Sequence, residues 1–164
     1  MTNDLSLVPF DHLAHAQMRL LHGLDIPDKQ REFGGSFAAT LQKYLSSSCS
    51  THNGLCILKD MEPIGMVVLK RPPSSPDWVP EDAASLHELK IDQNWQGQGL
   101  GKHVLLLTLD QVVTIWPGVR QLVLAVDSGN SAALALYRGF GMDDSGPVHL
   151  GRLGYEHRMT KKLG

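Results

Sequence analysis

Apolar and polar positions along the chain follow two different periods, and the change from one to the other separates strands from helices. Short segments, of which 54–60 and 65–71 are rich in β-forming residues and 120–126 is almost wholly apolar, predict strands at 5–10, 54–60, 65–71, 85–91, 120–126 and 154–163. Apolar residues three and four positions apart predict helices at 11–23, 36–47, 101–116 and 130–141. The segments 25–35 and 72–82 predict loops, and the second has four prolines in eleven residues.

The order of these elements predicts the class of fold. One strand and two helices come first, then a run of strands, then strands and helices in alternation. The stretch from Ser85 to Val126 is one strand–helix–strand unit, and such a crossover places its two strands in parallel. The whole therefore predicts an α/β protein, in its α+β form with a mixed sheet and helices on the faces of that sheet.

Length and composition narrow the class of protein. The 164 residues favour a single domain over 1–164, and the 42% hydrophobic and 20% charged residues are typical of globular proteins. A net charge of −2 argues against binding nucleic acid through a broad basic face. No apolar run is long enough to cross a membrane, and we expect no signal peptide. With only two cysteines, Cys49 and Cys56, we expect a cytoplasmic protein without a disulfide framework.

The stretch "NWQGQGLGKHV", residues 94–104, carries the clearest functional signal. It places Gly97, Gly99 and Gly101 between a predicted strand and a predicted helix. Glycine allows positive φ and lets backbone N–H groups come close to a ligand. At the start of a helix such N–H groups favour an anion, usually a phosphate. A tight turn without a ligand is the alternative, although such a turn needs only one or two glycines.

Two common phosphate loops fit this stretch poorly. A Walker loop would need Ser or Thr where His103 stands and a glycine where Gln96 stands. The dinucleotide fingerprint would need its third glycine where Lys102 stands. Asp127 lies near the place where that fingerprint has its acidic residue, so a dinucleotide-binding protein stays open as an interpretation.

A third pattern matches two separate segments. "QGQGLG", residues 96–101, fits Gln/Arg-x-x-Gly-x-Gly, and "NSAALALYRGFGM", residues 130–142, fits Asn-x-x-Ala-x-x-x-Tyr-x-x-x-Gly-Phe with Met142 in place of Phe. Together the two segments resemble the acyl-CoA loop and a second block of the GNAT superfamily of N-acetyltransferases, and the likeness covers roughly residues 85–142. The resemblance implies a central mixed sheet of six to seven strands with about four helices, and acetyl-CoA as the cosubstrate.

The resemblance also implies which residues bind acetyl-CoA. The pyrophosphate would lie on the backbone of Gln96, Gly97, Gln98, Gly99, Leu100, Gly101 and Lys102, and the pantetheine arm along Leu89, Lys90 and Ile91. Lys102 would either contact a phosphate or remain solvated. Asn130 is expected to cap the following helix and also to reach the cosubstrate.

Two residues are the candidates for catalysis. Tyr137 matches the acid of the family, which protonates the leaving thiolate, although a tyrosine here could also be a core residue. Glu88 is the candidate base, the alternative being a strand carboxylate paired with Lys90. His87 competes with it, since its ordinary pKa is near neutrality. Strand alternation predicts that His87 shares the face of Leu89 and Ile91, opposite Leu86, Glu88 and Lys90.

These observations predict an acetyl-CoA-dependent N-acetyltransferase. No cysteine lies near the two blocks, so we expect direct attack by a primary amine, on a small molecule or a peptide, in a ternary complex. A non-catalytic acetyl-CoA-binding or sensing module is the alternative. The loop residue Trp78 would cover the acceptor or anchor its loop, and Tyr155 and His157 would line the acceptor pocket. The eight histidines lack the spacing of a metal site, and a homodimer is the default assembly.

Overall fold

The computed structural model describes residues 4–44 and 49–164. Within these residues eight strands form one sheet in the order β1-β2-β3-β4-β5-β8-β6, with β7 paired to β8. The strands are β1 (Leu5–Pro9), β2 (His52–Lys59), β3 (Glu62–Lys70), β4 (Ala83–Ile91), β5 (Gln121–Asp127), β6 (Asp143–Asp144), β7 (His149–Gly151) and β8 (Gly154–Lys162). The α-helices are α1 (His15–His22), α2 (Asp28–Gly34), α3 (Phe37–Tyr44), α4 (Leu100–Ile115) and α5 (Ser131–Gly139).

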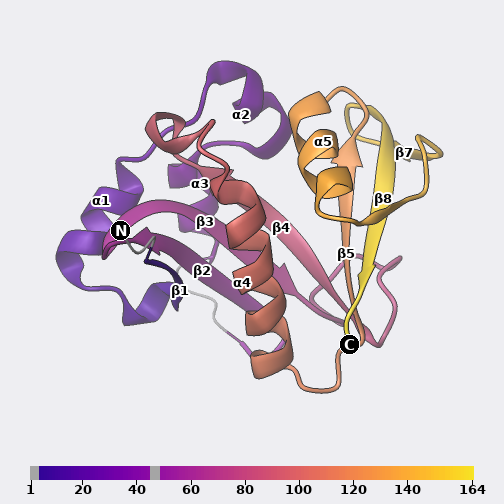
Figure 1. The fold of residues 1–164 in the computed structure, drawn as a ribbon, viewed down its shortest axis with the longest axis horizontal. Helices are drawn as coiled ribbons and strands as arrows, with labels where there is room; N and C mark the ends of the chain where they lie inside the picture. The colour runs from indigo at the N-terminus through magenta and orange to yellow at the C-terminus, as the bar shows by residue number, and fades with distance from the viewer. Residues whose placement is uncertain (1–3, 45–48) are drawn as a thin grey trace.

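The mixed character of the sheet is confirmed, and it comes from one strand pair. β4 and β5 are parallel, as the strand–helix–strand pattern predicts, whereas the other paired strands are antiparallel. The parallel pair holds for three residues of each strand, and its last partners are Ser85 and Val123. Beyond them the two strands separate, so that Figure 1 shows them together near the C-terminus and apart beside α5.

Helices cover both faces of the sheet and bury its apolar residues. The larger core cluster joins one face to α4 and α5, and the second joins the other face to α1 and α3. On α4 the buried residues are Leu100, Val104, Leu105, Thr108 and Val112. Their spacing of three and four positions is that of a single helix face, which explains why this segment forms the helix across the front of Figure 1.

Three short elements lie where the sequence predicts none. α2 occupies most of the predicted loop 25–35, and β6 and β7 together bring the sheet to eight strands instead of six to seven. α2 buries no residue, so it lacks the apolar stripe by which a helix is recognised. The first helix begins at His15, since residues 10–12 form a 3₁₀ turn.

A β-bulge in β4 corrects the predicted faces of that strand. Glu88 has a φ of 56°, and the pairing with β3 moves by one residue between His87 and Lys90. The inserted residue reverses the alternation. His87 therefore lies opposite Val68, on the α3 side with Glu88, whereas Leu86 shares the α4 side with Leu89. The prediction that His87 shares the face of Leu89 is wrong for this reason.

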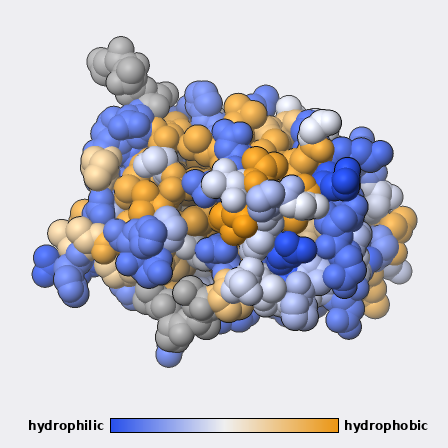
Figure 2. Space-filling view, turned by 90° about the horizontal axis from the view of Figure 1, so that it is seen from below, coloured by the Kyte–Doolittle hydropathy of each residue, from blue (hydrophilic) through white to orange (hydrophobic). Residues whose placement is uncertain are grey.

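The surface is mixed in character. The face seen from below carries several hydrophobic areas divided by hydrophilic ones (Figure 2). Large apolar side chains that are exposed include Leu20, Met61, Leu106, Val148 and Leu150. In the described part of the chain, the helices are all too short or too polar to cross a bilayer.

Candidate active site

The separation of β4 from β5 opens a cavity. This cavity has a volume of about 380 Å³, and its walls come from β4, β5, α5, the end of α2, β8 and the loop 72–82. A second cavity of about 210 Å³ extends toward Gln96. The two share wall residues, which are Gly34, Leu89, Lys90, Asn130, Ala133 and Tyr137. They therefore form adjacent parts of one cleft.

Glycine is needed at three positions after β4 for two different structural reasons. Gly97 and Gly99 have φ values of 76° and 75°, in the left-handed region that side chains disfavour. A Cβ at either position would meet nothing within 4 Å, so the space beside this part of the loop is open. A Cβ at Gly101 would lie 2.9 Å from Leu136 Cδ1, so this glycine allows α4 to pack against α5. The first two glycines therefore shape an exposed loop, and the third lets two helices pack against each other.

Side-chain hydrogen bonds hold this loop in place. Gln96 donates from Nε2 to the carbonyl of Ile91 at 2.7 Å and exchanges hydrogen bonds of 2.9 Å with Gln30 on α2. Asp92 accepts from the backbone N–H groups of Asp25 and Asn94 at 2.9 and 3.1 Å. The side chain of Gln96 thus makes hydrogen bonds within the protein, and only its backbone is available to a ligand.

The other predicted loop residues have diverse surroundings. Leu100 is buried in the core, and Gln98 is exposed. Lys102 is exposed as well, and its Nζ lies 3.6 Å from the Cβ position of Gly139 at the end of α5. Lys102 therefore reaches toward α5.

Tyr137 lies at the junction of the two cavities. Its side chain is 7% exposed and lines both of them. Among the described residues, the structure gives its phenol no hydrogen-bond partner. Burial raises the pKa of Tyr137 well above its usual range, so the phenol keeps its proton at neutral pH. Asn130 caps α5 by accepting from the N–H of Ala133 at 3.3 Å, as predicted, and also lines both cavities.

Glu88 is held by two neighbours on the wall of the larger cavity. Lys90 donates to its Oε2 at 2.5 Å and Thr40 at 2.9 Å, and Lys90 also donates to Thr40 at 2.6 Å. Burial alone would raise the pKa of Glu88, but these contacts with Lys90 and Thr40 outweigh it, so that the pKa is lowered. Lys90 is only 3% exposed in its side chain, and this burial lowers its pKa. The pairing of Glu88 with Lys90 is observed, in a partly buried setting.

His87 is a neutral group on the same wall. Its Nε2 lies 2.7 Å from Ser85 Oγ, and its ring lines the larger cavity. Burial, assisted by the charge of Lys70, lowers the pKa of His87 to about 4, against the opposing effect of Glu88. The imidazole is therefore uncharged at neutral pH and can accept a proton or a hydrogen bond.

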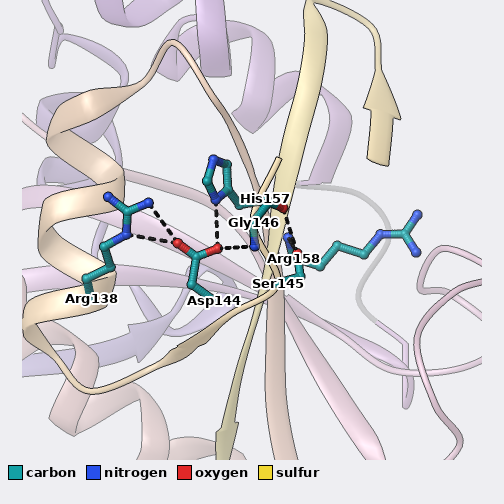
Figure 3. Close-up of polar contacts among 6 residues, drawn as sticks. All are labelled: Arg138, Asp144, Ser145, Gly146, His157 and Arg158. Atoms are coloured by element: carbon teal, nitrogen blue, oxygen red, sulfur yellow. Dashed lines mark hydrogen bonds and ion pairs between the residues drawn. The ribbon is translucent and has the colours of Figure 1, made fainter. Parts of the chain in front are cut away.

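A polar network ties α5, and with it Tyr137, to β8. Figure 3 shows Asp144 between Arg138 of α5, His157 of β8 and the backbone of Gly146. Asp144 accepts from Arg138 at 2.8 Å and from Gly146 N–H at 2.8 Å, and it lies 2.7 Å from His157 Nδ1. Burial alone would raise the pKa of Asp144, but hydrogen bonds from Gly146, His157 and Arg138 lower it to about 2.

The residues that β8 contributes to the cavity differ from the prediction. His157 is buried in that network, and Tyr155 is 58% exposed, so neither lines the cavity. Asp127 and Glu156 line it instead, from directly opposite positions on β5 and β8. Strand alternation could have found Glu156, since it points to the face opposite His157.

Trp78 anchors its loop, one of its two predicted roles, and also lies on the cavity wall. It lines the larger cavity, and its ring lies 4.5 Å from the guanidinium carbon of Arg158. It also packs against a small cluster of Val79, Ala83 and Val123. The ring thus fixes the loop 72–82 and forms part of the cavity wall.

Comparison with known proteins gives a family and a shared fold. A family model described as the acetyltransferase (GNAT) family matches residues 21–142. The [ribosomal protein bS18]-alanine N-acetyltransferase of Escherichia coli is 36% identical over 64 residues, which is 39% of this chain and 42% of that protein. The enzyme of the same description from Salmonella typhimurium matches to the same extent. The matched stretch thus spans less than half of these relatives.

Solved structures resemble the chain over nearly its whole length. A spermidine N-acetyltransferase from Vibrio cholerae, in complex with CoA and spermine, has a TM-score of 0.70 at 19% identity and covers 96% of this chain and 95% of its own. An aminoglycoside acetyltransferase, AAC(6')-Ib, in complex with coenzyme A, has a TM-score of 0.74 at 16% identity and covers 97% and 95%. At these identities the likeness is one of fold.

Proposed function

We propose that this chain, which belongs to the acetyltransferase (GNAT) family, transfers an acetyl group from acetyl-CoA to a primary amine by direct attack in a ternary complex. The observation that carries the proposal is the position of Tyr137. Its protonated phenol, which has no hydrogen-bond partner among residues 4–44 and 49–164, lies at two adjoining cavities, one extending toward the glycine loop and the other lined by carboxylates. Such a group is placed to serve a reaction between two ligands that meet beside it.

The glycine loop and β4 fit the two ends of acetyl-CoA, which supplies an activated acyl group as a thioester. The open space beside Gly97 and Gly99 leaves room for the pyrophosphate next to the loop, and the positive end of α4 favours its charge. β4 loses β5 as a partner after Ser85. The backbone groups of Leu89 and Ile91 that face the cleft therefore suit the amides of the pantetheine arm.

Tyr137 is proposed as the group that serves the leaving thiolate. A phenol with a raised pKa remains protonated over the whole physiological range, so it can donate a hydrogen bond or a proton as the thiolate forms. Its place on α5 is fixed by the Asn130 cap and by the Asp144 network.

Glu88 remains our proposed base, acting through water. It is ionised at neutral pH because its pKa is lowered, and its carboxylate lines the cavity. The same lowered pKa makes Glu88 a weak base, so its effect on the rate should be modest. His87, which is neutral on the same wall, is the second candidate.

The acceptor is proposed to be a primary amine with positive charge close to the reacting nitrogen. Asp127 and Glu156 lie side by side at the cavity and would attract an ammonium group. A cavity of about 380 Å³ suits a small molecule or the end of a peptide. Spermidine and aminoglycoside acetyltransferases share the fold, and an alanine N-acetyltransferase matches in part.

The test is CoA release in the presence of a panel of amines: a polyamine, an aminoglycoside and a peptide with an N-terminal alanine. Tyr137→Phe should lower kcat at least about 100-fold, since it removes a general acid, and leave the Kd of acetyl-CoA unchanged. Tyr155→Phe, at an exposed position, is the matched control and should keep the parent rate. A Tyr137→Phe enzyme as fast as the parent would overturn the assignment of the acid.

The alternative is a non-catalytic acetyl-CoA-binding module of the same fold. Such a protein would bind acetyl-CoA and release no CoA with any amine of the panel. If transfer occurs, intersecting initial-velocity lines would support the ternary complex, and parallel lines would contradict it.

We further propose a cytoplasmic location, supported by the two free thiols of Cys49 and Cys56. A homodimer remains a prediction, which sedimentation velocity tests. A monomeric sedimentation coefficient at micromolar concentration would contradict it.

A further inference from the structure

Lys90 is a buried cation beside the cleft. Of the lysines and arginines in residues 4–44 and 49–164, it is the one that is buried, with 5% of its surface exposed. Its stem packs against the end of α2, where Lys90 Cε lies 3.6 Å from the Cβ position of Gly34. A charge that is taken out of water in this way is costly unless it is paired and hydrogen-bonded. The burial of Lys90 therefore depends on the partners of its ammonium group.

Three hydrogen bonds join Lys90, Glu88 and Thr40 into a closed triangle. Lys90 Nζ donates to Glu88 Oε2 at 2.5 Å and to Thr40 Oγ1 at 2.6 Å, and Thr40 Oγ1 donates to the same carboxylate oxygen at 2.9 Å. An ammonium group has donors only, so Thr40 accepts from Lys90. The single proton of the hydroxyl is then left for Glu88 or for the carbonyl of Ser36 at 3.1 Å. One oxygen of Glu88 thus receives two donors.

The triangle connects the β-bulge of β4 to α3. Glu88 lies at the bulge with a φ of 56°, a backbone conformation that is strained outside glycine and needs support from its surroundings. Lys90, two residues further along β4, and Thr40 of α3 supply that support through the carboxylate. Glu88 lies on the wall of the larger cavity, and Lys90 lies on the walls of both cavities. The place of the carboxylate at the cleft therefore depends on these two neighbours.

The same neighbours decide the charge of Glu88. Burial raises the pKa of this carboxyl, but the hydrogen bond and the charge of Lys90, followed by the hydroxyl of Thr40 and the charge of Lys43, outweigh burial and lower the pKa. A carboxyl that kept its burial and lost Lys90 would have a raised pKa and would take up a proton at a higher pH. Lys90 thus keeps Glu88 in the form that can accept a proton.

The other titratable groups near Glu88 do not replace Lys90. His87, the preceding residue, is uncharged at neutral pH, and the charge of Lys70 on β3 acts on His87. Asp127 of β5 and Glu156 of β8 line the same cavity and carry the same charge as Glu88, so they can only favour its protonated form.

We propose that Lys90 and Thr40 are positioning residues for acetyl transfer, which hold Glu88 on the cavity wall as a carboxylate that accepts the proton of the attacking amine through water. The inference rests on the proposed function, in which Glu88 is the base. The amine nitrogen bonds to the acetyl carbon, and the bond from that carbon to the thioester sulfur breaks. The proton that the nitrogen loses passes through water to Glu88, while Tyr137 serves the leaving thiolate. Lys90 and Thr40 act through Glu88.

The first measurement needs no amine acceptor. NMR follows the titration of Glu88 in the full chain, labelled with ¹³C at the side-chain carboxyl of glutamate, and the Glu88→Gln chain identifies its signal. In the parent the carboxyl should stay ionised down to about pH 4. In Lys90→Met, which keeps a long side chain without the charge, the midpoint should lie at least about one pH unit above the ~4.3 of an ordinary glutamate. A midpoint no higher than that of the parent would overturn the inference.

The second measurement is the ratio of the kcat/KM of a variant to that of the parent, with one amine, between pH 5 and 8. The titration of the amine itself cancels in this ratio. For Lys90→Met the ratio should fall about tenfold as the pH falls from 8 to 5, because Glu88 becomes protonated over this range. A merely structural role would lower kcat/KM by the same factor at every pH, so a flat ratio would overturn the positioning role of Lys90.

Thr40 gives an independent test if Lys90→Met fails to fold. Thr40→Val removes the hydroxyl at nearly constant shape, and its ratio should fall about threefold between pH 8 and 5, whereas Thr40→Ser keeps the hydroxyl and should restore a flat ratio. Thr108→Val is the matched control, because Thr108 of α4 is also buried and also donates to the carbonyl four residues earlier. Equal pH profiles for Thr40→Val and Thr108→Val would overturn the role of Thr40.

The two measurements separate this inference from the proposed function. If no amine is acetylated at any pH, the proposed function fails, and the NMR midpoints of the parent and Lys90→Met still support or overturn the control of Glu88 by Lys90. If transfer occurs and the midpoints coincide, the proposed function stands and the inference about Lys90 is wrong.

Discussion

At the scale of single residues, the backbone of Glu88 decides which side chains meet in the cleft. Glu88 has a φ of 56° and lies at the β-bulge, where β4 has one residue more than the opposing part of β3. The bulge places His87, Glu88 and Lys90 on one face of the sheet. Positive φ is uncommon outside glycine, and Glu88 is held there by Lys90 and Thr40. A strict alternation of faces could not reveal this, because nothing in "LHELKI" signals a bulge.

The partly buried His87 should make the free energy of unfolding depend on pH. Its pKa is lowered to about 4 in the folded chain, against ~6.5 in an unfolded one. As the pH falls, His87 therefore binds a proton in the unfolded chain before it does so in the folded chain. The contribution of neutral His87 to the free energy of unfolding is complete above about pH 6.5 and is lost as the pH falls toward 4. His87→Gln should flatten the free energy of unfolding over this window, by up to about 3 kcal/mol at its lower end.

Urea unfolding at several pH values measures this effect. The exposed His103, changed to Gln, is the matched control and should leave the pH profile as it is. Parallel profiles for the parent and His87→Gln would show that His87 is not the group responsible.

At the scale of elements, the glycine loop and α5 each depend on a small number of positions. Gly99→Ala puts a side chain at a φ of 75° where nothing would collide with it, so its effect is that of backbone strain alone. We expect a loss of about 1–2 kcal/mol in the free energy of unfolding. The rearranged amides should also weaken acetyl-CoA binding about three- to tenfold.

Gly118→Ala is the control for this loop. Its Cβ would also meet nothing within 4 Å, but its φ is not in the left-handed region. It should change stability by less than about 0.5 kcal/mol and leave acetyl-CoA binding unchanged. Equal effects of the two substitutions would remove the conformational reason for the glycine at 99.

The polar network of Asp144 that holds α5 should be weakened by Asp144→Asn. The change removes the charge that pairs with Arg138 and His157, and should cost about 1–2 kcal/mol of stability at neutral pH. Because the pKa of Asp144 is lowered to about 2, its stabilisation is present above about pH 4 and lost between pH 4 and 2, and the variant should lack this acid transition.

Thermal unfolding between pH 2 and 7 measures the stability of the parent and of Asp144→Asn. Asp143→Asn, at the exposed neighbouring position, is the control. kcat should fall together with stability if the network positions Tyr137. A stable, fully active Asp144→Asn enzyme would contradict a positioning role.

At the scale of the whole molecule, the sequence predicts the family and the central fold better than it predicts the cavity residues on β8. The block around Gln96 leads into α4 and the block around Tyr137 lies on α5, and both helices form as expected. The sequence does not predict α2, because this helix buries no residue and is held by contacts such as that of Gln30 with Gln96. Two- and three-residue strands such as β6 and β7 have no periodicity to detect, and they exist because β8 offers them an edge.

The central claim is that the cleft between β4 and β5 binds an acyl-CoA beside Tyr137. Isothermal titration calorimetry with acetyl-CoA, and in parallel with NAD⁺, tests it most directly. Two temperatures are needed, because the binding enthalpy can be close to zero at one of them. We predict saturable binding of one acetyl-CoA per chain and none of NAD⁺. The absence of binding by acetyl-CoA and CoA at both temperatures, or a preference for NAD⁺, would contradict the claim.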